Sequence, residues 1–122
     1  MASNPPPNQF NLPILHKIYD IYKLFYEYSE SIPRKDRYCI GQKCENLILD
    51  ILELVIASIQ SLKNEKIKLL NEVSIKLNVL RIIIRLAKDV KALDFKKYLS
   101  LQEKINEIGR MLGGWIKSLN NH

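Results

Sequence analysis

The stretch that decides the fold is YLSLQEKINEIGRMLGGWIKSL, residues 98–119. Its apolar residues recur at alternating spacings of three and four, the repeat of a helix that packs against partner helices along one seam. The seam residues are Tyr98, Leu101, Ile105, Ile108, Leu112, Trp115 and Leu119. The repeat predicts a long amphipathic helix in the last third of the chain.

Glycines interrupt this helix at Gly109 and Gly113, which lie four residues apart and therefore on one face. Glycine costs roughly 1 kcal/mol against alanine in a helix interior, so the pair requires a reason. Because another backbone can approach closely where side chains are missing, we interpret Gly109, Gly113 and Trp115 as a helix-packing or oligomer contact. The alternative is that Gly114 ends the helix, but Trp115 and Ile116 continue the apolar pattern.

Composition places the chain among soluble proteins of one domain. It has 122 residues, 47% hydrophobic and 26% charged, which suffices for a single core. No run approaches the roughly 18 uninterrupted apolar residues of a membrane span. The N-terminal residues lack the basic and apolar regions of a secretory signal, so we expect a cytoplasmic protein.

Helical periodicity continues through the rest of the chain, and no alternation typical of strands appears. The segments expected to be helical are about 13–31, 35–62, 65–92 and 95–118, and residues 1–12, rich in proline and asparagine, are expected to form a flexible arm. The predicted break before the third helix is Lys63-Asn64-Glu65.

Local signals support these boundaries and the way the helices connect. Pro13 suits a first helical turn, and the residue before Pro33 resists helical geometry. Asp94 is expected to cap the last helix. Because the connections are short, the predicted fold is all-α: an antiparallel up-down-up-down four-helix bundle of residues 13–119.

The predicted helix over 65–92 carries more apolar surface than such a bundle can bury. Its apolar residues sweep roughly 200° around the axis, whereas a helix at the surface of a monomeric bundle buries little more than about 100°. The helix either sits deeper than bundle geometry suggests or packs against another subunit. A stripe of Val79, Ile82, Leu86 and Val90 left exposed would promote aggregation, so we favour a homo-oligomer.

A line of cations occupies another face of this helix. Arg81, Arg85 and Lys88 follow at spacings of four and three, which places them in a line about 10 Å long. Arginine forks match phosphate oxygens, and the formal net charge of +6 favours a polyanionic partner. We predict contacts with nucleic acid or a partner here, the alternative being an ordinary solvated face with Arg85 and Lys88 paired to nearby acids.

Two smaller groups of residues lie outside this line. Arg34, Lys35 and Arg37 form a basic cluster at the turn between the first two helices, where it could bind phosphate or an acidic partner or only solvate a helix end. Tyr19, Tyr22 and Tyr26 share a face of the first helix and are expected to line the core or a groove.

Residues for catalysis or metal binding do not form a motif. Cys39 and Cys44 would point about 140° apart on a helix, which is poor for a disulfide and incomplete for zinc, and Cys44 is expected to be a core thiol. His16 and His122 supply no ligand pair. No nucleotide-binding loop or Glu-x-x-His motif is present, so we expect no catalytic residues, no metal and no cofactor.

Four stretches of the sequence carry a family resemblance: Leu12-Pro13-Ile14-Leu15, residues 33–38, residues 85–89 and, most specifically, GRMLGGWIK at 109–117. Together they resemble the accessory variability determinant (Avd) family of diversity-generating retroelements. That family belongs with other small four-helix-bundle proteins, including the ribosomal-RNA intervening-sequence proteins. The resemblance spans about residues 12–118.

The resemblance implies a pentameric barrel that binds the retroelement's reverse transcriptase and associates with RNA or DNA, independently of sequence, through a basic surface. It implies support for copying a template RNA into the adenine-mutagenised cDNA that diversifies a target gene. Two positions depart from the pattern: Asn78, where an acidic residue is expected, and Cys39, where a small hydroxyl-type residue is expected. The competing function is a structural or protein-interaction bundle with no retroelement role.

Overall fold

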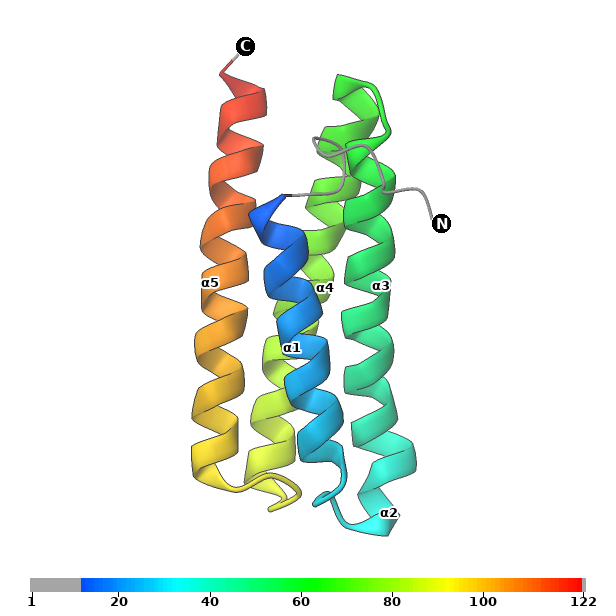
Figure 1. Cartoon of the computed structure of the whole chain (residues 1–122), viewed down its shortest axis with the longest axis vertical. Helices are drawn as coiled ribbons and strands as arrows, with labels where there is room; N and C mark the ends of the chain where they lie inside the picture. Colours follow the sequence, from blue (N-terminus) through cyan, green and yellow to red (C-terminus); the bar gives the residue numbers. More distant parts are fainter. Residues whose placement is uncertain (1–11, 122) are drawn as a thin grey trace, which may run out of the picture.

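The computed structural model describes residues 12–121, and its architecture is a bundle of four long helices (Figure 1). The long helices are α1 (Pro13–Ser29), α3 (Gln42–Ile59), α4 (Lys63–Asp89) and α5 (Phe95–Asn120), and α3 is entered through a short helix, α2 (Arg34–Asp36), and a π-helical turn, η1 (Arg37–Gly41). Within residues 12–121 there is no strand. The predicted all-α four-helix bundle is confirmed.

Successive long helices run in opposite directions, as the colour gradient in Figure 1 shows. The pairs in contact are α1 with α3, α3 with α4, α4 with α5, and α5 with α1, which closes a ring of four helices. One end of the bundle therefore brings together α2, the end of α4 and the start of α5, and we call it the α2 end.

Each long helix contributes one face to a shared core. The apolar residues with no exposed surface come from α3, α4 and α5: Cys44, Val55, Leu70, Val73, Ile84, Leu101 and Ile105. Full burial of an aliphatic side chain contributes roughly 1.5–3 kcal/mol, so each of these positions is important for stability. Burial raises the pKa of the Cys44 thiol to about 12, which confirms a core thiol, while Cys39 is free and exposed.

The tyrosines of α1 lie mostly outside this core. The helix turns Ile14, Ile18, Ile21 and Phe25 inward. Tyr19 and Tyr26 follow Ile18 and Phe25 by one residue, about 100° around the helix, and are exposed. The prediction of core tyrosines is therefore wrong for these two, and Tyr22, which is partly buried, is the one that packs against the core.

The break between α3 and α4 lies at residues 60–62, so the predicted break at 63–65 is wrong. The hydroxyl groups of Ser58 and Ser61 donate to the carbonyls of Val55 and Ala57, both at 2.7 Å, and close the end of α3. The charged residues that suggested a break instead open α4. Glu65 lies in the first turn, where a carboxylate interacts favourably with the helix dipole.

Two other boundaries differ from expectation by a turn or less. Helix α1 ends at Ser29 rather than Ser31, and α5 continues to Asn120. Of the predicted flexible arm, residues 1–11 lie outside the described part of the chain, and Leu12 immediately precedes α1.

The connection from α4 to α5 is closed by a left-handed residue. Helix α4 ends at Asp89, three residues before the predicted end, because Lys91 adopts a φ of 66°. The backbone N–H groups of Ala92 and Leu93 then both donate to the carbonyl of Ala87, at 2.8 and 3.2 Å, and both side chains enter the core. Asp94 caps α5 as predicted, its Oδ1 accepting from the backbone N–H of Lys97 at 2.8 Å.

We predict that Lys91→Gly stabilises the protein by about 1 kcal/mol, because a Cβ atom is unfavourable in the left-handed region and glycine removes it. Urea denaturation measures the change. Lys91→Ala is the control: it removes the same charge but keeps the Cβ atom, so it should not stabilise. Equal effects of the two variants would show that the charge, and not the backbone conformation, matters here.

Candidate nucleic-acid interface

Helix α4 leaves a continuous apolar stripe on the surface. Its members, 38–64% exposed, are Ile75, Val79, Ile82, Leu86 and Val90. The helix therefore does not sit deeper in the bundle, which was one of the two explanations for its surplus of apolar residues. We call these five residues the α4 stripe. No described residue of the same chain covers it, and its burial by a second copy stays a prediction.

The predicted line of cations divides into three different environments. Arg81 is partly buried: its Nη1 donates to Asn78 Oδ1 at 2.6 Å, and its backbone carbonyl accepts from Gln102 of α5 at 3.1 Å. Lys88 Nζ lies 4.7 Å from the ring centre of Tyr98 and 3.3 Å from Asp89 Oδ1. Arg85, between them, is exposed.

The line was interpreted either as a contact surface for nucleic acid or a partner, or as a solvated face with paired cations, and its three residues differ in this respect. Lys88 is paired with Asp89, as the solvated-face alternative expects, and it also makes a cation–π contact. Arg85 forms no ion pair with any residue in the described range. Because Arg81 and Lys88 both contact α5, the line follows the boundary between α4 and α5. We call this boundary the α4–α5 seam.

A groove of about 420 Å³ opens along the seam beside Arg81. Its polar lining consists of Ser74, Asn78, Arg81, Asn106 and Arg110, and Gly109 and Gly113 form part of its floor. Among the residues of the described range that line it, none carries a carboxylate. The groove lining thus holds two arginines and two amides with no compensating acid. Sequence reasoning missed Arg110, although its position directly after Gly109 was a usable signal.

The glycines do not pack against another backbone of the same chain. A Cβ atom at Gly109 would meet Arg81 Nη2 at 3.2 Å and Leu77 Cδ2 at 3.6 Å, both of them side-chain atoms. At Gly113 and Gly114 it would meet nothing within 4 Å. Close backbone packing within the chain is therefore wrong as an explanation, and so is the alternative of a helix end, since α5 continues to Asn120.

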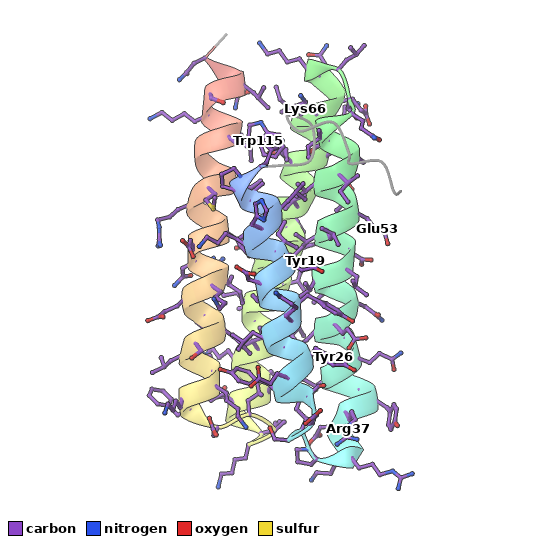
Figure 2. All side chains as sticks on the ribbon, in the orientation of Figure 1. Tyr19, Tyr26, Arg37, Glu53, Lys66 and Trp115 are labelled. Atoms are coloured by element: carbon purple, nitrogen blue, oxygen red, sulfur yellow. The ribbon has the colours of Figure 1, made fainter. Side chains whose placement is uncertain are left out.

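Trp115 does pack as predicted, although on the other side of α5. It is partly buried against the core and, with Met111, Ile59 and Lys66, lines an apolar pocket of about 380 Å³. Figure 2 shows Trp115 and Lys66 near the end of the bundle opposite the α2 end. The pocket and the groove on the seam share no lining residue, so they are separate.

The acids of the neighbouring faces are paired elsewhere. Glu107 of α5 forms an ion pair with Lys17 of α1 at 3.2 Å, and Asp50 of α3 pairs with Lys76 at 3.4 Å. These carboxylates lie at the α1–α5 and α3–α4 boundaries. Neither carboxylate therefore neutralises the positive charge of the seam.

All three residues of the basic cluster at the α2 end are exposed, and Arg37 also has a structural role. Arg37 Nη2 donates to the carbonyls of Glu30 and Ile32, each at 3.3 Å, and so closes the turn between α1 and α2 (Figure 2). Arg34 and Lys35 are exposed on α2. The cluster lies at the end of the bundle, and none of its members lines the groove.

Two features are absent from residues 12–121: a cluster of metal-ligating side chains and a membrane-spanning helix. No three His, Cys, Asp or Glu side chains of this range gather as metal ligands. None of its helices combines the length and apolar character needed to cross a bilayer.

Comparison with known protein families shows to which family the chain belongs. A family model described as bAvd-like matches residues 12–119. The chain belongs to the bAvd-like family. This confirms the resemblance read from GRMLGGWIK and the other stretches. No curated protein is similar enough in sequence to match.

For this bAvd-like chain, we predict that Gly113→Ala and Gly114→Ala each raise the free energy of unfolding by about 0.5–1 kcal/mol. Both positions lie inside α5 with open space around the added methyl group, so only the helix propensity changes. Gly109→Ala should gain less, because its Cβ atom crowds Arg81. Urea denaturation tests all three, and a loss of stability confined to Gly113→Ala would mean that a second chain lies against that position.

Proposed function

We propose that this chain is a non-catalytic accessory protein of a diversity-generating retroelement. In this role it binds the reverse transcriptase and the template RNA or cDNA through its basic surface and so supports mutagenic reverse transcription. The observation that carries the proposal is the α4–α5 seam, whose groove is lined by two arginines and, among the described residues, by no acid, on a chain of the bAvd-like family.

Phosphate contact is the chemistry that this seam suits best. Arginine presents its donors in a planar fork that matches phosphate oxygens, and both Arg81 and Arg110 line the groove. Arg85 and Lys88 extend the positive charge toward the α2 end. Because contacts with phosphate carry no base information, binding by such a surface is independent of sequence.

Self-assembly follows from the α4 stripe. From Ile75 to Val90 the stripe runs about 22 Å along the helix, too long to leave in water without a risk of aggregation. We assign it to contact with further copies of this chain, in a pentamer as the family resemblance implies. The stripe borders the cationic face of α4, so assembly would bring the seams of several copies into one basic surface.

We predict that the protein has a mass several times the 14.3 kDa of one chain when measured by light scattering at micromolar concentration. Ile82→Glu should lower this mass to that of a smaller species, because it places a charge in the middle of the α4 stripe. Leu62→Glu is the matched control: Leu62 is 87% exposed and lies outside the stripe, so assembly should persist. A monomeric wild-type protein would contradict the proposed assembly.

We predict that the wild-type protein binds RNA or DNA with an affinity that falls steeply with salt, since counterion release drives binding to phosphates. The double variant Arg81→Ala, Arg85→Ala should bind more weakly, with a salt slope shallower by roughly one unit for each phosphate interaction that it removes. The control is the double variant Lys23→Ala, Lys43→Ala, which removes the same charge from exposed positions on α1 and α3. It should leave the affinity and the salt slope nearly unchanged.

The same variants distinguish the two classes of partner. If the arginine variant no longer associates with the reverse transcriptase but keeps nucleic-acid binding, the seam is a protein interface. If the wild-type protein binds neither nucleic acid nor reverse transcriptase, the retroelement role is wrong and a purely structural bundle remains.

A further inference from the structure

The geometry points to the groove between α4 and α5 as the place where a backbone phosphate of single-stranded nucleic acid is held, between Arg81 and Arg110 and against the floor at Gly113. This assignment depends on the proposed nucleic-acid binding and specifies where on the protein the nucleic-acid strand lies. The groove, the glycines and an exposed aromatic ring at the end of the seam support it.

The groove offers hydrogen-bond donors and no negative charge. Asn78 Oδ1 holds Nη1 of Arg81, and the backbone of Arg81 is fixed to Gln102. The guanidinium is thereby held beside Gly109 with donors left for a ligand, since arginine carries five N–H donors. Arg110 and the amide of Asn106 add further donors from α5. An anion with several acceptor oxygens complements this set.

The size of the groove favours a phosphodiester over a single carboxylate. Its volume of about 420 Å³ falls within the roughly 300–1,000 Å³ of pockets that hold whole organic ligands. Because a Cβ atom at Gly113 would meet nothing within 4 Å, the space reaches the helix backbone itself. A phosphate with part of its flanking sugars can therefore enter, which a side chain at Gly113 would prevent.

The seam continues from the groove toward an exposed aromatic ring. Arg85 lies about 6 Å beyond Arg81 and Lys88 about 10 Å beyond it, by the rise of the helix. Lys88 is seated over Tyr98, and the ring of Phe95, which is 62% exposed, lies 6.0 Å from the ring of Tyr98. Cationic tracks combined with exposed aromatic rings are typical of single-strand binding, because unstacked bases can stack on the rings.

The experiment compares Gly113→Leu with Gly114→Leu. Both positions have open space around the Cβ atom, but only Gly113 lines the groove. The probe is a fluorescein-labelled single-stranded oligonucleotide whose dissociation constant is measured by anisotropy at several salt concentrations. We expect Gly113→Leu to weaken binding about tenfold and to flatten the salt slope, and Gly114→Leu to bind like wild type. Circular dichroism and light scattering check folding and assembly.

A second pair of variants keeps the assignment testable if Gly113→Leu disturbs folding or assembly. Arg110→Gln removes a groove cation at an exposed position and should also weaken binding several-fold. Phe95→Ala should weaken binding of the single strand while leaving binding of the corresponding duplex unchanged. Wild-type affinity in Arg110→Gln would overturn the assignment.

The remaining outcomes separate the groove from the wider proposal. If wild type binds the oligonucleotide and Gly113→Leu binds equally well, the groove assignment is wrong and nucleic-acid binding stands. If wild type does not bind at all, nucleic-acid binding fails and the groove assignment fails with it. If Gly113→Leu keeps oligonucleotide binding but no longer binds reverse transcriptase, the groove holds an acidic protein segment instead.

Discussion

Each helix of a four-helix bundle can give only about a third of its circumference to the shared core, and this limit governs the rest of the molecule. In α4 the core face is filled by Leu70, Val73, Leu77, Leu80, Ile84 and Ala87. The remaining two thirds of that helix cannot be buried by α3 and α5. One part carries the α4 stripe and the part next to α5 carries Arg81, Arg85 and Lys88. The packing that satisfies the core therefore also separates an apolar surface from a cationic one.

The charges of α5 are sorted by the same packing. Glu107 faces α1 and pairs with Lys17, whereas the side facing α4 presents Gln102, Asn106 and Arg110. No carboxylate among the residues that line the groove neutralises it. The exposed glycines Gly113 and Gly114 together lack about 1–2 kcal/mol of helix stability that alanines would supply. No contact within the described chain requires a glycine at either position. At Gly113 the missing side chain keeps the groove open.

The sequence predicted those features that depend on one helix at a time. Periodicity and cap chemistry were enough for the bundle, the burial of Cys44 and the cap at Asp94. The break between α3 and α4 was misplaced because charged residues suit a helix start as well as a loop, and the deciding hydrogen bonds come from Ser58 and Ser61.

The groove required information that no single helix contains. It exists because α4 and α5 are rotated so that Arg81 lies beside Gly109, and neither helix's own pattern specifies that rotation. The π-helical turn at Arg37–Gly41 and the left-handed Lys91 likewise follow from how the connections fit the bundle ends. Interpreting Gly109 and Gly113 as a backbone contact within the chain was wrong, because a glycine pair leaves space but does not show what occupies it.

The adjacency of the α4 stripe and the seam links assembly to binding in the proposed function. One groove with its few neighbouring cations can form only a few phosphate contacts, and such contacts are weak at physiological salt. Copies joined through the stripe would present several seams to one strand. After the first contact, each further contact would be intramolecular and would benefit from a high effective concentration. A sequence-independent surface thereby gains affinity without any base-specific contact, so disruption of the stripe should weaken nucleic-acid binding even though no stripe residue carries a charge.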